Sequence, residues 1–325
     1  MIKERTYIYI FIILGMLLIA SCSSSDDGGS GTPNPVAATC TDGIQNGNET
    51  GIDCGGSSCD SCPTGVVIPT SGFDAPTSYD GYDMVWSDEF NDNELSLQKW
   101  SFNIGDGCPN LCGWGNEELQ SYTNNAENLF FEEGNLVIAA RSEGGSSYSS
   151  SRINTDNKFE FQYGRVDIRA SMPSPRGTWV ALWLLNHNYT ITNPGAWWPN
   201  GGEIDIMEYL GEKPTEVFGT AHYGSDFNSR RFNSKEYPAP DENYNKTYYV
   251  FSIIWEENKI TWLVNDVEYH SITPSQTNGQ PYPFNDEFYL IMNLSVGGNL
   301  PDASPLATDY PAFLLVDYIR VHQKK

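Results

Sequence analysis

From Tyr82 onward, the chain consists of short segments in which apolar and polar residues alternate. Turn signals such as Glu257-Asn258 and Asn265-Asp266 separate these segments, which are rich in Val, Ile, Tyr, Phe and Trp. Residues two apart on a strand share a face, so the alternation is typical of strands with one buried face. The sequence has no long helical period. The pattern therefore predicts an all-β sandwich. Its clearest segments are 134–142, 165–172, 248–272 and 314–323.

The first 21 residues have the composition of a secretory signal peptide. Lys3 and Arg5 form a basic start, and the apolar run that follows is short for a membrane span. The run ends in Ile-Ala-Ser-Cys, which resembles a bacterial lipobox, so we expect acylation of Cys22 and removal of the residues before it. An ordinary cleaved signal is the alternative. Residues 22–39 are rich in Ser, Gly, Asp and Pro and predict a flexible acylated tether. Together these features indicate an outer-membrane lipoprotein at the cell surface.

Residues 40–64 are rich in cysteine and predict a small disulfide-bonded module. The last three cysteines match an iron–sulfur spacing formally, and zinc is a second possibility. Because the chain is exported and the count is even, two disulfides are favoured, and the sequence leaves their pairing open. Residues 65–81 read as a linker. Further along, Cys108 and Cys112 predict a local disulfide. The cysteines of the module are Cys40, Cys54, Cys59 and Cys62.

Composition narrows the class of ligand. The 325 residues include 18 Lys and Arg against 42 Asp and Glu, a formal charge of −24. Nucleic acids and anionic membranes require a basic face, so this balance argues against both, and it also disfavours sulfated polysaccharides. Aromatic residues make up 13% of the chain, which suits a surface that stacks on sugar rings. We expect a neutral polysaccharide ligand and a monomeric protein.

The stretch GGEIDIMEYL places three carboxylates within six strand-like residues. Glu203 and Asp205 are two apart and share a face, whereas Glu208 should point the other way. A bulge at Met207 or a neighbour would return Glu208 to the same face. Carboxylates that close together raise the pKa of at least one of them. Glycoside hydrolysis uses such a pair, one carboxylate to attack and one carboxylic acid to protonate. An acidic solvated strand face and a calcium loop are the alternatives, but the apolar residues between the acids disfavour both.

The stretch GEIDIMEYL resembles the active-site strand of glycoside hydrolase family 16, in the longer form found in laminarinases, which are endo-1,3-β-glucanases. The resemblance covers about residues 82–323, so we expect a catalytic domain over residues 82–325. It implies a β-jelly roll, concanavalin A-like, with an open concave substrate cleft. Further blocks with this resemblance are VWSDEFN (85–91), WGNEELQSYT (114–123), GRVDIRASMP (164–173), GTWVALWLL (177–185), GTAHYG (219–224), FYLIMNLSVGGNLPD (288–302) and VDYIRVHQ (316–323).

The resemblance also implies the catalytic roles. Glu203 should be the nucleophile that forms a covalent glycosyl–enzyme, and Glu208 the general acid and then the general base. Asp205 should hydrogen-bond the nucleophile and tune both pKa values. Two carboxyls close together predict retention of the anomeric configuration.

Six further residues are candidates for binding substrate. Two tryptophans four apart on one strand share a face, and a third precedes the catalytic strand. The block WGNEELQ carries Glu117 where the usual pattern has Asn, which puts the sugar contact of this block in doubt. The histidine of GTAHYG should bind sugar near the acid/base, with a structural role as the alternative. The six are Trp179, Trp183, Trp198, Asn116, Glu118 and His222.

A structural calcium is also expected from the resemblance. The matching positions are Glu89, Gly134 and Asp317, where main-chain carbonyls and one carboxylate suit the oxygen preference of calcium. We expect no cofactor for catalysis.

Three other functions remain open at this point. The same fold and carboxylates serve mixed-linkage glucanases, agarases, porphyranases and carrageenases. A non-catalytic glycan-binding lipoprotein is a second reading, although both Glu203 and Glu208 are present. A transglycosylase is a third, because it differs from a hydrolase only in passing the glycosyl group to sugar instead of water.

Overall fold

The structure is a computed structural model that describes residues 40, 57–59, 65–190, 198–240 and 243–325. The chain divides into two compact units, Met1–Gly65 and Val66–Lys325. In the first unit, a disulfide joins Cys40 to Cys59, as expected for a disulfide-bonded module. The other two cysteines of the module, Cys54 and Cys62, lie outside the described residues, as do the signal peptide, Cys22 and the tether.

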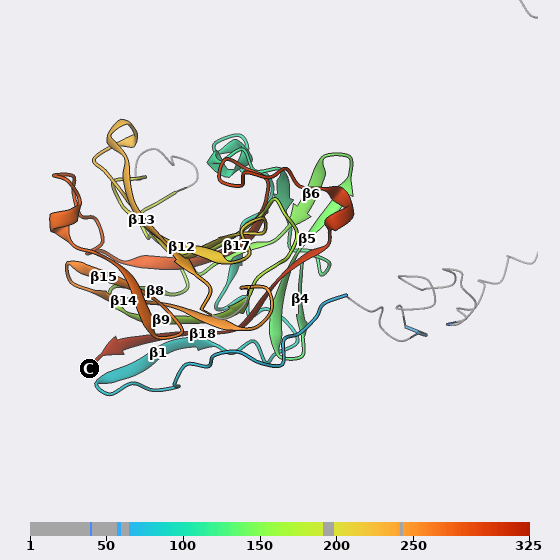
Figure 1. Cartoon of the computed structure of the whole chain (residues 1–325), viewed down its shortest axis with the longest axis horizontal. Helices are drawn as coiled ribbons and strands as arrows, with labels where there is room; N and C mark the ends of the chain where they lie inside the picture. Colours follow the sequence, from blue (N-terminus) through green and yellow to red (C-terminus); the bar gives the residue numbers. More distant parts are fainter. Residues whose placement is uncertain (1–39, 41–56, 60–64, 191–197, 241–242) are drawn as a thin grey trace, which may run out of the picture. The chain divides into compact units, whose positions relative to one another are not determined.

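Two packed β-sheets form the second unit, which confirms the predicted all-β sandwich (Figure 1). The described part of the chain holds a ten-stranded and an eight-stranded sheet, and nearly all neighbouring strands run antiparallel. The ten-stranded sheet contains β1 (Tyr82–Asp88), β3 (Gln120–Tyr122), β4 (Leu129–Glu132), β5 (Asn135–Gly144), β6 (Ser147–Ser150), β9 (Gly164–Ser171), β14 (Tyr249–Glu256), β15 (Lys259–Val264), β16 (Val267–Ile272) and β18 (Ala312–Lys324). The eight-stranded sheet contains β2 (Ser101–Phe102), β7 (Arg152–Asn154), β8 (Glu160–Phe161), β10 (Thr178–Asn186), β11 (Glu203–Leu210), β12 (Glu216–Tyr223), β13 (Arg231–Pro238) and β17 (Phe288–Val296).

Strand order places β11 in the interior of the eight-stranded sheet, which runs β13-β12-β11-β10-β17-β7-β2. The ten-stranded sheet follows the order β16-β15-β14-β9-β18-β5-β6-β3. Helical structure in the described residues is limited to single turns, η1 (Cys112–Gly115), η3 (Phe227–Ser229), η4 (Pro274–Gln276) and η5 (Ala307–Asp309). The predicted local disulfide between Cys108 and Cys112 is present at the start of η1.

The core lies between the two sheets and follows from the alternation seen in the sequence. On β10, Val180, Leu182 and Leu184 are fully buried in it, whereas Trp179 and Trp183 point to the opposite face and stay partly exposed. Each large apolar side chain buried in this way contributes about 1.5–3 kcal/mol. We call the side of the eight-stranded sheet that points away from the core the open face.

The predicted turns are confirmed. Asn258 begins the return from β14 to β15, and Asn265 and Asp266 connect β15 to β16. All three have positive φ, at 61°, 49° and 64°. Asn and Asp tolerate this left-handed region better than most residues, which is why they mark tight hairpin turns.

Residues 66–81 are not a linker, and the expected domain boundary at residue 82 is too late. The compact unit begins at Val66, and this segment packs on the face of the ten-stranded sheet that points away from the core. The main-chain N–H of Phe73 donates to Tyr248 at 3.1 Å, and that of Ala75 donates to the Tyr318 hydroxyl at 2.8 Å. We call residues 66–81 the N-terminal strap.

The strap also covers a buried charge. Asp167 of β9 is fully buried and accepts hydrogen bonds from Arg165, from the Ser252 hydroxyl at 2.6 Å and from the Tyr79 hydroxyl at 2.9 Å. A buried carboxylate is tolerated only when its oxygens are satisfied, so Tyr79 links the strap to the sheet through a group that the sheet requires.

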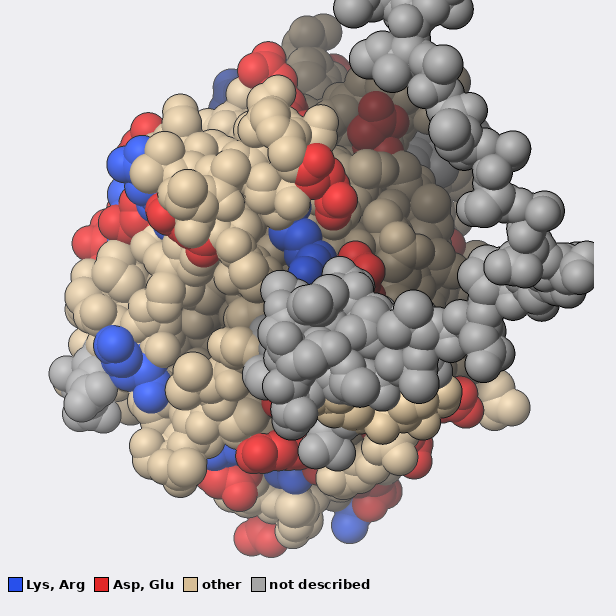
Figure 2. Space-filling model, turned by 90° about the vertical axis from the view of Figure 1, so that its right-hand side faces the viewer, with Lys and Arg blue, Asp and Glu red and all other residues tan. Residues whose placement is uncertain are grey.

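The surface reflects the acidic composition. Figure 2 shows Asp and Glu side chains spread over one side of the molecule, with a few Lys and Arg among them. Among the described residues, no helix has the length and apolar character needed to cross a membrane.

Candidate active site

A β-bulge on β11 brings the three carboxylates to one face, as predicted. Against β10, Met207 pairs with Leu182 and Asp205 pairs with Trp183, so Ile206 is the extra residue. Ile206 and Met207 both lie in the core. Two consecutive inward side chains reverse the alternation, so Glu208 joins Glu203 and Asp205 on the open face.

Glu203 is held by a tryptophan on one side and approached by a histidine on the other. The Trp198 indole N–H donates to Glu203 Oε2 at 3.1 Å, and His222 Nε2 lies 3.8 Å from Oε1. Burial, followed by the charge of Asp205, raises the pKa of Glu203. The charge of His222 and the Trp198 hydrogen bond act in the opposite direction.

Glu208 has a different pair of partners. The Trp179 indole N–H donates to its Oε1 at 3.1 Å, and the Thr220 hydroxyl donates to its Oε2 at 3.3 Å. The Glu208 residue is 9% exposed, and burial followed by the charge of Asp205 raises its pKa. A carboxyl with a raised pKa keeps its proton at higher pH, which a general acid needs.

Asp205 lies between the two and is 3% exposed. Its Oδ2 is 3.3 Å from His222 Nε2, and burial raises its pKa. One ligand atom from each of Glu203, Asp205 and His222 lies within 4.8 Å of the others. Within the part of the chain that the structure describes, this is the one cluster of three His, Cys, Asp or Glu side chains close enough to hold a metal ion.

The predicted aromatic residues lie on the open face. Trp183 donates its indole N–H to Asn293 of β17 at 2.8 Å, and it packs beside Trp198 on a small apolar cluster. The Arg152 guanidinium lies over two rings, 4.5 Å from the centre of Trp114 and 4.9 Å from that of Trp183. The expectation that Trp183 and Trp179 share a face is confirmed by the unbroken pairing of β10 with β17, in which Trp179 lies opposite Ser295 and Trp183 opposite Ile291.

Glu118 is the centre of a hydrogen-bond network. Its Oε2 accepts from Gln120 at 2.7 Å, from the Tyr122 hydroxyl at 3.1 Å and from the Ser295 hydroxyl at 3.0 Å. Asn116 Nδ2 lies 3.5 Å from the other carboxylate oxygen. With three donors on one oxygen, Glu118 fixes the position of its neighbours, and a sugar hydroxyl would compete with those donors for it.

Two of the three residues expected to hold calcium pair with arginines. Glu89 accepts two hydrogen bonds from Arg320, at 3.0 and 2.8 Å, and Asp317 forms an ion pair with Arg169. Gly134 turns the chain between β4 and β5 with φ 77°. Because Arg169 neutralises the one expected carboxylate ligand, the contacts of these side chains do not favour a cation there.

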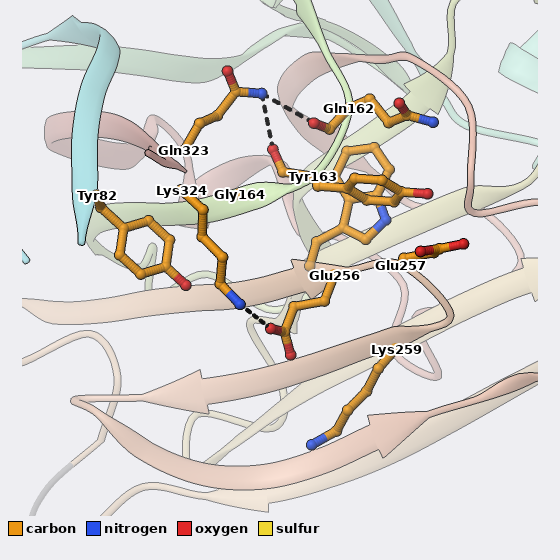
Figure 3. A pocket seen from close by; sticks show the side chains of 10 residues that line it. Tyr82, Gln162, Tyr163, Gly164, Glu256, Glu257, Lys259, Gln323 and Lys324 are labelled. Atoms are coloured by element: carbon orange, nitrogen blue, oxygen red, sulfur yellow. Dashed lines mark hydrogen bonds and ion pairs between the residues drawn. The ribbon is translucent and has the colours of Figure 1, made fainter. Parts of the chain in front are cut away.

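Apart from the open face, a pocket lies at one end of the ten-stranded sheet (Figure 3). It has a volume of about 670 Å³, and Tyr82, Tyr163 and Glu257 are among its lining residues. Lys324 in this pocket is paired with Glu256 at 2.5 Å. None of the three carboxylates of β11 lines it, so we assign the chemistry to the open face.

Two glutamates on one face, each held by its own hydrogen-bond donors, are the kind of carboxyl pair that glycosidases use. A comparison with known families shows which family the chain belongs to, because the model of Glycosyl hydrolases family 16 matches residues 116–311. The chain belongs to glycosyl hydrolase family 16.

Relatives of this family 16 chain align with about three quarters of its length. The chain is 37% identical over 265 residues to Glucan endo-1,3-beta-glucosidase A1 of Niallia circulans, covering 75% of this chain but only 38% of that protein. It is 38% identical over 255 residues to Beta-glucanase of Rhodothermus marinus, covering 74% of this chain and 85% of that protein.

Solved family 16 structures share the fold. The laminarinase catalytic domain of Thermotoga maritima superposes with a TM-score of 0.68 at 37% identity, covering 76% of this chain and all of that one. The endo-beta-1,3-glucanase of Pyrococcus furiosus gives 0.67 at 36% identity, covering 75% of this chain and 95% of that one. These neighbours have the β-jelly roll, which confirms the predicted fold.

Sequence analysis missed several residues of this family 16 site. Thr220 of β12 reaches Glu208, and Ser234 of β13 hydrogen-bonds Thr220 at 2.8 Å. Asn293 and Ser295 connect Trp183 to Glu118. Thr220 lies two residues before His222 on β12, and Asn293 and Ser295 lie two apart on β17, so the strand period was the signal that could have found these three.

Proposed function

We propose that this protein is a retaining endo-β-1,3-glucanase that hydrolyses laminarin-type β-glucans. The observation that carries the proposal is that Glu203 and Glu208, both on β11, accept hydrogen bonds from different donors. Trp198 holds Glu203, whereas Trp179 and Thr220 hold Glu208, with Asp205 between them. The two glutamates thus have separate surroundings, as a nucleophile and an acid require.

The first step cleaves the glycosidic bond. The Glu203 carboxylate attacks the anomeric carbon while Glu208 gives its proton to the leaving oxygen, so a glycosyl ester of Glu203 forms and the shortened chain leaves with a free hydroxyl. Trp198 keeps one oxygen of Glu203 hydrogen-bonded and leaves the other for attack. Burial favours the protonated form of Glu208, whereas the charge of His222 and the Trp198 hydrogen bond favour the ionised form of Glu203.

The second step releases the sugar. Glu208, now ionised, takes a proton from water, and the resulting hydroxide attacks the anomeric carbon and frees Glu203. Two inversions at one carbon give net retention. Asp205, with His222 3.3 Å away, lies beside Glu203 and influences the pKa values of both glutamates.

A neutral β-1,3-glucan is the substrate that the relatives and the charge favour. The proteins from Niallia circulans and Pyrococcus furiosus carry names for 1,3-glucan cleavage, and the one from Thermotoga maritima is named a laminarinase. A chain with a formal charge of −24 would repel a sulfated polymer.

Reducing-sugar release from laminarin, lichenan, agarose, porphyran and carrageenan tests the proposal. The full chain should cut laminarin to mixed short oligomers with retained configuration, and Glu203→Gln should abolish turnover while still binding the polymer. Cleavage of another polymer alone would overturn the substrate. Binding without cleavage by the unmodified chain would overturn the enzyme assignment.

We also propose that the chain is a monomeric outer-membrane lipoprotein acylated at Cys22 and displayed at the cell surface. The lipobox-like Ile-Ala-Ser-Cys ending and the acidic residues after it support this. Labelled palmitate should enter the wild-type chain and not a Cys22→Ser variant. Protease added to intact cells should remove the enzyme, and resistance to it would contradict surface display. Light scattering of the detergent-solubilised protein tests the monomeric state.

A structural calcium at Glu89, Gly134 and Asp317 remains a prediction of the family resemblance. Calcium binding there would require Asp317 to give up its ion pair with Arg169. Melting curves with calcium and with chelator should differ if the ion binds, and identical curves would refute it.

A further inference from the structure

Phe232 of β13 is an exposed aromatic residue on the open face. Its side chain is 67% exposed, and in the ladder it lies directly opposite His222 of β12. Residues directly opposite in an antiparallel pair share a face, so Phe232 lies on the same side of the sheet as Glu203. Its ring centre is 6.0 Å from that of His222.

Phe232 ends a row of rings that starts beside the nucleophile. Trp198, which donates to Glu203, lies 6.1 Å from the ring of His222 and 5.8 Å from that of Phe227. We call Phe227, Trp198, His222 and Phe232 the aromatic row. It continues the site from β11 across β12 to the edge strand β13.

The two phenylalanines of the row have different surroundings. The Arg230 guanidinium lies 4.2 Å from the ring centre of Phe227 and donates to its carbonyl at 2.9 Å. Phe227, which is 54% exposed, thus contacts both Arg230 and Trp198. Among the described residues, Phe232 has a ring contact with His222, and most of its surface faces solvent.

An exposed phenylalanine on an edge strand is a liability. Unpaired edges with apolar side chains promote aggregation, and proteins usually place charges or proline there. The rest of β13 follows that rule, with Arg231, Lys235, Glu236 and Pro238. The exception lies at the position that faces the active site.

We propose that Phe232 is a stacking platform for a glucosyl unit of the polymer, outside the unit whose bond is cut. The inference rests on the proposed β-glucanase function. Strands lie about 4.8 Å apart, so β13 is about 10 Å from β11, and a sugar on Phe232 is not the one at Glu203. An uncharged ring suits the C–H face of a neutral pyranose, and the strand ladder fixes its position before substrate binds.

Length dependence of the kinetics tests this. Phe232→Ala in the full chain should raise KM for laminarin and long oligosaccharides about five- to tenfold with kcat little changed, because a stacking contact of this size is lost. The shortest cleavable oligosaccharide, which does not reach Phe232, should be unaffected. Phe232→Tyr should restore the wild-type KM. Leu97→Ala, at a residue of similar exposure (63%) just before β2, is the control and should change nothing.

The outcomes separate the two proposals. If the unmodified chain does not cleave laminarin, the proposed function fails and this inference fails with it. If the unmodified chain is active but Phe232→Ala leaves KM for long substrates unchanged, only the inference fails. An equal loss on short and long substrates would also overturn it, since that result indicates a structural role.

Discussion

Trp262 of β15 donates its indole N–H to the main-chain carbonyl of Asp205 on β11, 2.8 Å away, across the core between the two sheets. A bulge leaves a residue without a ladder partner, so a carbonyl there needs another donor. The ten-stranded sheet supplies that donor. Trp262 is thus a positioning residue for the catalytic strand.

Replacing Trp262 by Phe removes the donor and keeps an aromatic ring. The unsatisfied carbonyl should cost about 1–3 kcal/mol of stability. We also expect kcat to fall about tenfold, the effect of about 1.4 kcal/mol on the barrier, with a shifted pH profile. Trp255→Phe is a matched control, because Trp255 is equally buried and donates to the Phe284 carbonyl at 2.8 Å. It should lose stability and keep its pH profile, and a shared shift would contradict the positioning role.

Gly219 makes room for this contact. It lies on β12 beside the bulge, and a Cβ there would come within 2.4 Å of the Tyr269 hydroxyl and 2.6 Å of Trp262 Cδ1. Gly219→Ala should therefore destabilise the protein by about 1–3 kcal/mol and reduce activity, measured by denaturant unfolding and laminarin turnover. Gly145→Ala, at a glycine with φ 63° and nothing within 4 Å of an added Cβ, measures the loss caused by backbone strain without overlap. Because Gly219 is not among the glycines with positive φ, a Gly219→Ala variant of unchanged stability would rule out the steric explanation.

Thr220 should influence the upper pH limit of activity through its hydrogen bond to Glu208. Its hydrogen bond favours the charged form of Glu208 and lowers that pKa. Thr220→Val removes the bond at similar volume, so the pKa of Glu208 should rise and the alkaline limb of kcat/KM should move to higher pH. Thr261→Val, at a buried threonine of β15, should leave the profile in place. A shift to lower pH would show that Glu208 is not the acid.

The N-terminal strap should contribute to the stability of the catalytic unit. Deletion of residues 66–81 removes its hydrogen bonds to Tyr248, just before β14, and to Tyr318 of β18, together with the Tyr79 donor to Asp167. Each kcal/mol lost from the free energy of unfolding lowers Tm by about 2–4 °C in a domain of this size. We expect Tm to fall by about 10 °C or more. Deleting sixteen residues of the tether, 23–38, is the control of equal length. A strap deletion with unchanged Tm would return the segment to the role of a linker.

Local patterns were sufficient for the catalytic strand. The spacing of Glu203, Asp205 and Glu208, with Ile206 and Met207 between them, required a bulge to bring the acids to one face, and the structure has it. The strands and the turns at residues such as Asn265 could likewise be predicted, because they depend on the backbone preferences of residues adjacent in the sequence.

Contacts between distant segments could not be read in this way. Asp317 meets Arg169 across 148 residues, and Glu118 meets Ser295 across 177. Both depend on the order in which strands join a sheet, which the period of one strand does not encode. The strap was missed for the same reason, since its partners Tyr248 and Tyr318 lie more than 170 positions away.

The strap also determines where a mechanical load would enter the molecule. Tension applied to the chain before Val66 would reach the hydrogen bonds of Ser71 to Thr247 and Tyr248 before those of Phe73 and Ala75. These bonds, on the face of the ten-stranded sheet that points away from the core, would break before the Tyr79–Asp167 hydrogen bond. The catalytic strand β11, in the other sheet, would bear no direct pull. An enzyme held at its N-terminus in moving fluid or against a solid polymer could thus lose part of its strap before its catalytic geometry changes.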